Sequence, residues 1–122
     1  TRKNGLPGTG PGRRPKTAMR PRRGEVWWGE EPERERRPYV VLTRNSAIGT
    51  LSEVLVAVVT RTIRHIPTQV EIDQSDGMRE PCAINLDDLL MMPLRQLTER
   101  QCELSPERMA EVCAALDAAT EC

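Results

Sequence analysis

Hydrophobic residues in this chain come in short runs that either alternate with polar residues or are rich in valine. The runs of this kind span residues 24–28, 38–43, 53–60, 69–72, 82–86 and 99–103. Runs of this length, bounded by glycine, proline or charged residues, predict β-strands. The segment 53–60 contains an unbroken apolar run from Val54 to Val59, which predicts a central strand covered on both faces.

One helix is clearly indicated, at the C-terminal end. Ser105 is a typical N-cap residue, and Pro106 fits the first helical position. An apolar stripe follows at helical spacing and runs to about residue 119: Met109, Val112, Cys113 and Leu116. Short strands followed by one helix predict a mainly β (α+β) fold, with five to seven strands in a small, strongly bent sheet or partly open barrel closed by the helix.

The segments between the strands carry weaker signals. Residues 44–50 break the second strand, and we expect a helical turn there with Asn45 or Ser46 as its cap. Residues 73–80 form a loop that turns at Asp76-Gly77. Asp87-Asp88 marks the exit of the fifth strand, and residues 89–94 fit either a strand or a helical turn.

Charge divides the chain into two parts. The formal net charge is zero, with 18 basic and 18 acidic residues, but residues 1–23 hold eight of the basic residues and no acid. The rest therefore has ten arginines against eighteen acids, a net charge of −8. We expect a disordered, basic, proline- and glycine-rich arm over residues 1–22 and one domain over residues 23–122. Three interpretations of the arm stay open: a phosphate-binding tether, a solvated tail, or an upstream extension ahead of a start at Met19.

Several classes of function are disfavoured by composition. The four cysteines form no Cys-x-x-Cys pair and there is one histidine, so we expect no metal site and no cofactor. There is no glycine-rich phosphate-binding loop before a helix and no Gly-x-Ser-x-Gly elbow. The longest apolar run is far below the roughly 18 residues of a membrane span. With no signal peptide visible, we expect a cytoplasmic protein with reduced thiols.

Arginines and hydroxyls near strand ends are the remaining groups with useful chemistry: Arg37, Thr43, Thr60, Arg61, Thr62 and Arg64. An arginine offers a planar fork of donors that suits phosphate. If the strands that carry Arg37 and Thr60 are neighbours, the cluster forms an oxyanion-type site for phosphodiester cleavage. The alternative is that Arg37 is a surface arginine and that the threonines are ordinary strand residues.

Four sequence motifs in order resemble the MazF/PemK family of toxin endoribonucleases. They are Arg23-Gly24-Glu25-Val26-Trp27, Arg37-Pro38 running into Val40-Val41-Leu42-Thr43, Val58-Val59-Thr60, and Ile66-Pro67-Thr68-Gln69-Val70. Each motif alone is weak, but their order and separations are fairly specific. The resemblance covers residues 22–119 and implies a compact SH3-like barrel, related to that of the CcdB group.

The resemblance also implies a site and a reaction. The family's essential arginine falls on Arg37 and its essential threonine on Thr60, and an acid/base aspartate of the PemK branch falls on Asp87. The implied reaction is metal-independent attack of an RNA 2′-hydroxyl on the adjacent phosphate, giving a 2′,3′-cyclic phosphate and a 5′-hydroxyl. The residues expected to contact RNA are Arg36, Thr43, Arg61, Thr62, Arg64 and Asn85.

The partners implied are single-stranded RNA, a second copy of the chain in a homodimer, and a MazE-like antitoxin with an acidic C-terminal tail. Two other functions stay open from the sequence. One is a non-catalytic, CcdB-like toxin that binds a protein target. The other is a plain nucleic-acid-binding barrel whose affinity depends mainly on the basic arm.

Overall fold

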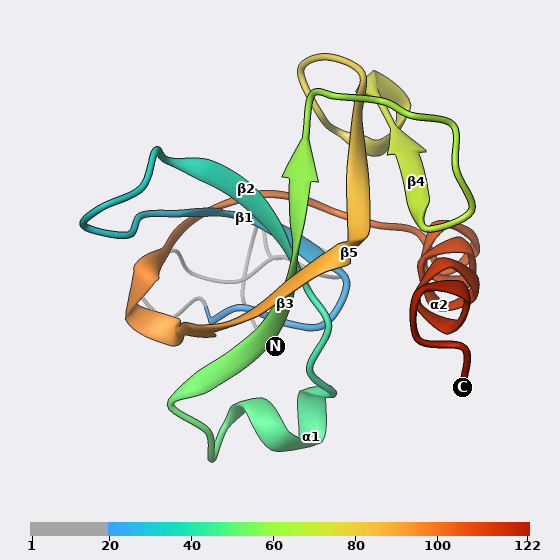
Figure 1. Ribbon diagram of the computed structural model, residues 1–122. Helices are drawn as coiled ribbons and strands as arrows, with labels where there is room; N and C mark the ends of the chain where they lie inside the picture. Colours follow the sequence, from blue (N-terminus) through green and yellow to red (C-terminus); the bar gives the residue numbers. More distant parts are fainter. Residues whose placement is uncertain (1–19) are drawn as a thin grey trace, which may run out of the picture.

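The computed structural model describes residues 20–122 (Figure 1). The predicted arm therefore lies outside the described residues, apart from its last three positions, and so does Met19. Pro21 is buried, and the backbone N–H of Arg22 donates a 2.9 Å hydrogen bond to Glu25 Oε1. The residues directly before the first strand are thus attached to the fold.

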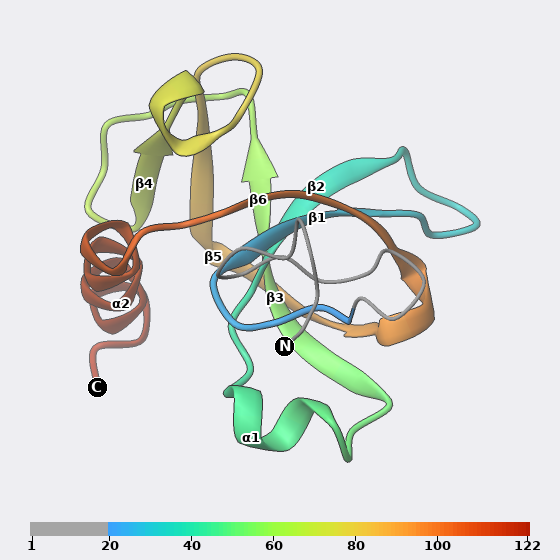
Figure 2. The same cartoon turned by 180° about the vertical axis from the view of Figure 1, so that it is seen from behind.

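Six strands form one antiparallel sheet in the described part of the chain. They are β1 (Glu25–Gly29), β2 (Arg37–Val41), β3 (Glu53–Thr60), β4 (Gln69–Ile72), β5 (Cys82–Pro93) and β6 (Leu97–Glu103). The helices are α1 (Asn45–Ile48) and α2 (Pro106–Thr120), with short 3-10 turns η2 (Gln74–Asp76) and η3 (Leu94–Gln96). The strand order is β4-β5-β3-β2-β1-β6, and α2 lies beside β4 in both views (Figures 1 and 2). The predicted bent, open, mainly β architecture with a C-terminal helix is confirmed.

The sheet is buried on both faces, as predicted for its central strand β3. Alternate residues of a strand point to opposite sides, so β3 contributes to two separate apolar clusters. Ala57 and Val59 belong to the cluster that α2 covers through Val112, whereas Val56 and Val58 pack in the other cluster. Burial on both faces explains why this segment is apolar without alternation.

The predicted exit of the fifth strand at Asp87-Asp88 is wrong, because β5 continues to Pro93. Ala57 of β3 lies opposite Leu89, but the next residue, Val58, lies opposite Asn85. Leu86, Asp87 and Asp88 therefore form a bulge in the ladder between β3 and β5. The two aspartates mark a bulge within the strand. In the sequence, a polar pair at a bulge looks the same as a polar pair at the end of a strand.

Two details of the helices also differ from expectation. Neither Asn45 nor Ser46 caps α1: the N-cap is Arg44, without a side-chain bond, and Asn45 Oδ1 accepts from the backbone N–H of Arg23 at 2.7 Å. In α2, Ser105 caps the helix as predicted, accepting from Arg108 N at 3.0 Å. Cys113, however, is exposed, and Ala115 is buried in its place.

The loop between β4 and β5 is fixed by its own contacts and by α2. Asp73 caps η2 in a capping box with Asp76, and Gly77 adopts the left-handed conformation at φ 105° that ends the turn. Arg108 of α2 holds Asp76 with two charge-assisted bonds of 3.0 and 3.1 Å. These contacts set the position of Met78, Arg79 and Glu80 above the start of β5.

The close packing of Gly29 against the Tyr39 ring gives a stability test. A Cβ at Gly29 would lie 2.5 Å from Tyr39 Cε2 and 3.0 Å from Met92 Sδ, so Gly29→Ala overpacks the core. We expect this variant to lose about 1–3 kcal/mol of unfolding free energy in urea denaturation. Gly49→Ala is the matched control because nothing lies within 4 Å of the added carbon, and it should be neutral or slightly stabilising. Equal stabilities of the two variants would contradict close packing of Gly29 against Tyr39.

Candidate functional site

Arg37 and Thr60 lie at the same end of the β2–β3 pair. The antiparallel register places Tyr39 opposite Val58, Val40 opposite Ala57 and Val41 opposite Val56. If this register is continued by two residues beyond the Tyr39–Val58 pair, Arg37 on β2 comes to lie opposite Thr60 on β3. Both side chains are half-buried, and both line the same pocket. The condition set by the sequence, that these two strands be neighbours, is met.

Strand parity places these residues on one face of the sheet, which we call the Arg37–Thr60 face. Tyr39 and Val58 belong to the same apolar cluster, and Arg37 and Thr60 are each two residues away from one of them. The face extends to β5, because Asn85 lies opposite Val58. Four polar side chains from three strands thus share it: Arg37, Tyr39, Thr60 and Asn85.

Tyr39 lies among the charges of this face. Its side chain is 1% exposed, and burial raises the pKa of its hydroxyl above the usual 10.0. Glu31 and Asp88 raise this pKa further, while the guanidinium groups of Arg37 and Arg34 lower it. Arg37 and Asp88 are therefore close enough to Tyr39 for their charges to act on it.

The β5 bulge brings carboxylates next to this face. Asp87 is exposed, and its Oδ2 accepts a 2.6 Å hydrogen bond from the hydroxyl of Thr68. Its backbone N–H donates to Asn85 Oδ1 at 3.1 Å. Asp88, which follows it, acts on the Tyr39 hydroxyl. The predicted acid/base residue Asp87 is thus linked to Asn85, and its neighbour Asp88 has the electrostatic contact with Tyr39.

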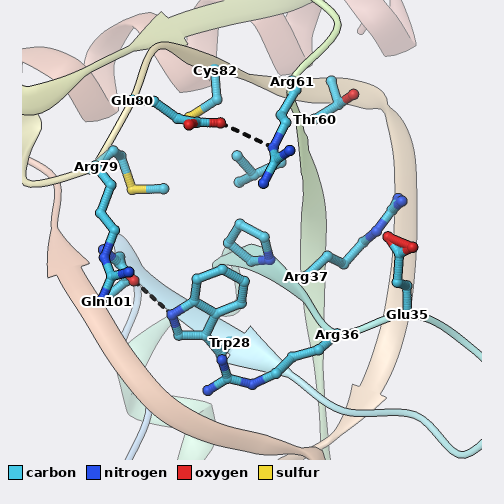
Figure 3. Close-up of a pocket in the computed structure, with 13 residues that line it drawn as sticks. Trp28, Glu35, Arg36, Arg37, Thr60, Arg61, Arg79, Glu80, Cys82 and Gln101 are labelled. Atoms are coloured by element: carbon cyan, nitrogen blue, oxygen red, sulfur yellow. Dashed lines mark hydrogen bonds and ion pairs between the residues drawn. The ribbon is translucent and has the colours of Figure 1, made fainter.

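A pocket of about 470 Å³ opens at the same end of the sheet (Figure 3). Its floor is apolar, formed by Pro38, Val59, Met78 and Cys82. Its walls are Trp28, Gln101 and charged side chains from three segments: Glu35, Arg36, Arg37, Arg61, Arg79 and Glu80. In Figure 3 the Arg37 and Thr60 side chains point to one side of the view, away from Trp28. They form one rim of the pocket, while Trp28 lies within it.

Trp28 and Arg36 form one wall, which is held rigidly. The Arg36 guanidinium stacks on the Trp28 ring at 4.5 Å from the ring centroid. Glu30 and Glu99 bind the same guanidinium at 3.2 and 2.7 Å. The indole Nε1–H of Trp28 donates a 2.6 Å hydrogen bond to Gln101 Oε1, which fixes the plane of the ring.

The pocket gathers arginines on a domain whose net charge is negative. Four arginines and two glutamates line it, although the chain after residue 23 carries −8, and Glu30 and Glu99 bind Arg36 from outside the lining. Glu80 pairs with Arg61 at 3.0 Å, which leaves Arg79 as an exposed cation above the floor. The arrangement can attract a polyanion to one place on an otherwise acidic surface.

Four of the residues expected to contact RNA do not line the pocket: Thr43, Thr62, Arg64 and Asn85. Thr43 is beyond the opposite end of β2, where its hydroxyl accepts from the backbone N–H of Leu55 at 2.7 Å. Thr62 and Arg64 follow β3, and both are tied by Gln69: Arg64 N–H donates to Gln69 Oε1, and Gln69 Nε2 donates to the Thr62 carbonyl. Arg36 and Arg61 line the pocket with Arg37 and Thr60, and Asn85 lies on the Arg37–Thr60 face. The Thr62 backbone N–H also donates to the Thr60 hydroxyl at 3.1 Å, whereas Thr43 is at the other end of β2.

Three residues of this region were missed by reasoning from the sequence. Trp28 and Tyr39 lie within the predicted strands 24–28 and 38–43, where aromatic residues are common, and nothing in the local pattern marked them as site residues. Glu31 has a buried Oε1 with no hydrogen-bond partner in the described structure. The pair Trp27-Trp28 was an available signal for Trp28. Consecutive residues of a strand point to opposite faces of the sheet, so the two tryptophans cannot both pack in the same apolar cluster.

Neither a metal cluster nor a membrane helix occurs in residues 20–122. No group of three or more histidine, cysteine, aspartate or glutamate side chains there is placed to hold a metal ion. Within the same residues, no helix is long and apolar enough to cross a bilayer.

The charges around Tyr39 can be tested directly, because it is the one tyrosine in the chain. Its absorbance titration should have a midpoint above 10.0 while circular dichroism shows folded protein. Arg37→Ala should raise the midpoint further, since Arg37 lowers the pKa, and Glu31→Gln should reduce it. A midpoint that neither substitution moves would place Arg37 and Glu31 away from the hydroxyl.

Comparison with known proteins agrees with this geometry. Residues 22–120 match the sequence model of the family described as PemK-like, MazF-like toxin of type II toxin-antitoxin system. A relative from Mycobacterium tuberculosis, "Probable endoribonuclease MazF5", is 42% identical over 84% of this chain and 94% of its own length. "Probable endoribonuclease MazF2" from the same organism is 33% identical over 83% of this chain and 99% of its own length.

Solved structures with a similar fold are described as endoribonucleases or toxins. One is an "Endoribonuclease in complex with its cognate antitoxin from Mycobacterial species", with a TM-score of 0.75 and 25% identity over 83% of this chain and 95% of that one. Another is "Mycobacterium tuberculosis toxin MazF-mt6", with a TM-score of 0.74 and 24% identity over 80% of this chain and 96% of that one. The family match spans the whole fold from before β1 to the end of α2, and this chain belongs to the PemK-like, MazF-like toxins of type II toxin-antitoxin systems.

Proposed function

We propose that this protein is an endoribonuclease toxin that cleaves single-stranded RNA at the Arg37–Thr60 face. The observation that carries the proposal is the placement of Arg37 and Thr60 at one end of the β2–β3 pair, on the rim of a pocket lined by four arginines. The relatives named as endoribonucleases support the same activity.

The reaction we propose is transfer of the phosphate within one nucleotide unit. The RNA 2′-oxygen attacks the adjacent phosphorus, the bond from phosphorus to the 5′-oxygen breaks, and the products are a 2′,3′-cyclic phosphate and a 5′-hydroxyl. Negative charge builds on the nonbridging oxygens as the new bond forms. The Arg37 guanidinium donates to these oxygens, and the Thr60 hydroxyl donates a further hydrogen bond that positions the phosphate.

Proton transfer needs a base for the 2′-hydroxyl and a donor for the 5′-oxygen. Asp87 remains our candidate for acid/base work, because it follows Asn85 on the strand next to Thr60 and is exposed to solvent. Its Oδ2 already accepts from Thr68, so a substrate hydroxyl would use the other carboxylate oxygen. Asn85, Arg36 and Arg61 surround the phosphate path and are proposed as RNA contacts.

A single-stranded substrate follows from the geometry of the attack. The 2′-oxygen must move in line with the leaving 5′-oxygen, which the regular stacking of a duplex prevents. The protein would act in the cytoplasm, inhibiting translation and growth. A solved structure of similar fold contains an endoribonuclease with its cognate antitoxin. We propose that this chain likewise forms a homodimer and binds an antitoxin whose acidic C-terminal tail is attracted by the same arginines.

Replacing either central residue should remove most of the activity. Arg37→Ala and Thr60→Val are each expected to slow RNA cleavage by about 100- to 1,000-fold, the usual effect of losing one donor to a developing oxyanion. Arg37→Lys should also be impaired, since a single ammonium cannot replace the planar fork. The measurement is the appearance of RNA 5′-hydroxyl ends in the presence of EDTA.

Arg44→Gln is the matched control. It removes one exposed positive charge at the far end of β2 and should cleave like the unsubstituted protein. RNA that stays intact when mixed with a stoichiometric amount of the protein would contradict the proposed activity. Growth arrest without new 5′-hydroxyl ends would instead favour a toxin that binds a protein target. Loss of RNA binding on deletion of residues 1–18 alone would favour a plain nucleic-acid-binding barrel.

A further inference from the structure

We propose that the pocket around Trp28 is a base-binding subsite, which accepts the nucleobase of a nucleotide next to the scissile phosphate and gives the cleavage its base preference. This inference rests on the proposed function. It assigns a separate task to side chains that take no part in the phosphate chemistry, above all Trp28, Gln101 and Arg79.

The first argument is the position of the pocket relative to the Arg37–Thr60 face. Consecutive strand residues point to opposite sides, so Arg37 and Pro38 face opposite sides of β2. Pro38 lies opposite Trp28 in the β1–β2 ladder, and Pro38 and Val59 form the pocket floor. The pocket and the Arg37–Thr60 face therefore meet at one rim. An RNA strand with a phosphate at Arg37 and Thr60 has an adjoining base within reach of Trp28.

The second argument is the preorganised aromatic surface. Trp28 is partly exposed. Trp27 is only 4% exposed and packs on the other face of the sheet, in the apolar cluster with Tyr39 and Val58. Arg36 stacks on the Trp28 ring, two glutamates hold Arg36, and Gln101 accepts from the indole N–H. These contacts fix both the ring and the cation above it before any ligand binds. Aromatic rings and guanidinium planes of this kind are the surfaces on which unpaired bases stack.

The third argument is the chemistry of the rest of the lining. Pro38, Val59 and Met78 give an apolar floor for the flat face of a base, and Arg79 places a positive charge at the edge, beside the Arg61–Glu80 ion pair. A nucleobase attached to a phosphate backbone needs this combination of an apolar slot and a cationic edge. Met78 and Arg79 are held in place by the η2 loop, which Arg108 anchors to α2 through Asp76. The Met78 side of the pocket is therefore tied to α2.

The test that separates this task from catalysis is the base preference of cleavage. A random single-stranded RNA pool is digested, and the 5′-hydroxyl ends are sequenced to give the preference at each position near the cut. In the unsubstituted protein, one position next to the cut should show a strong preference. Trp28→Ala should reduce the preference at that position by about five- to 150-fold, the range expected from loss of one base–aromatic stack, and leave the other positions unchanged.

Two further variants serve as controls for folding and charge. Trp28→Tyr keeps an aromatic ring and a donor toward Gln101, so it should retain most of the preference even if Trp28→Ala folds poorly. Arg44→Gln should keep the whole profile. Thermal unfolding of each variant identifies any loss of the fold.

A binding measurement tests the pocket without cleavage. Short RNA oligonucleotides with 2′-O-methyl groups cannot form the cyclic phosphate, and a base stacked on Trp28 should quench its fluorescence. The quenching should persist in Arg37→Ala and disappear in Trp28→Tyr, which leaves only the buried Trp27. If the unsubstituted protein gives no 5′-hydroxyl ends, the proposed function fails, yet this quenching still decides whether the pocket binds a base.

Two results would overturn the inference. One is an unchanged cleavage profile in a folded Trp28→Ala variant, together with no quenching by the methylated RNA. The other is that Trp28→Ala weakens binding of an acidic peptide while leaving RNA affinity and base preference intact, because the pocket would then belong to a protein partner.

Discussion

The hydrogen-bonded pairing of β2 with β3 holds Tyr39 opposite Val58, and the next pair of side chains on the same face is Arg37 and Thr60, two residues further along each strand. A shift of one residue would turn every side chain of β2 to the other face of the sheet and would bury Arg37 against an apolar cluster. The shift is disfavoured because the two clusters are filled by different side chains of this segment: Tyr39 and Val41 pack in one, and Val40 and Leu42 pack in the other. The stability of the fold and the geometry of the site therefore depend on the same register.

The acidic domain can bind a polyanion because its charges are separated in space. The eighteen acids of the chain outnumber the ten arginines after residue 23, but four of those arginines line one pocket. Several acids form ion pairs with the arginines of the pocket: Glu30 and Glu99 orient Arg36, and Glu80 orients Arg61. The formal charge of the domain is thus a poor guide to the potential that RNA meets at this end of the sheet.

Much of the fold was predictable because the signals were local. The valine-rich run gave β3 with its observed bounds, and Ser105-Pro106 gave the start of α2. The bulge in β5 was not predictable, since Asp87-Asp88 has the polarity of a strand end and only the pairing with β3 shows that the strand continues. The same limit applies to Cys113, whose helical spacing fits the buried stripe although the helix turns Ala115 inward.

For the site, the sequence predicted residues but not distances. Arg37, Thr60, Arg61 and Asn85 do gather at one end of the sheet, while Thr43 is separated from them by the length of β2. That separation depends on how β2 runs relative to its neighbours in the sheet, which cannot be read from the residues around Thr43. Trp28 was overlooked for a related reason: its function as a pocket wall requires Gln101 of β6 and Arg36, and these meet only when β1 pairs with both of its neighbours.

The central claim is that Arg37 and Thr60 act on the same phosphate. A double-mutant cycle on the rate of RNA cleavage, with Arg37→Ala, Thr60→Val and the combined variant, tests this most directly. Residues that act on one group are strongly non-additive, so the combined variant should be only slightly slower than the worse single variant. Single effects that multiply in the combined variant would show that the two residues act independently, and would contradict the account.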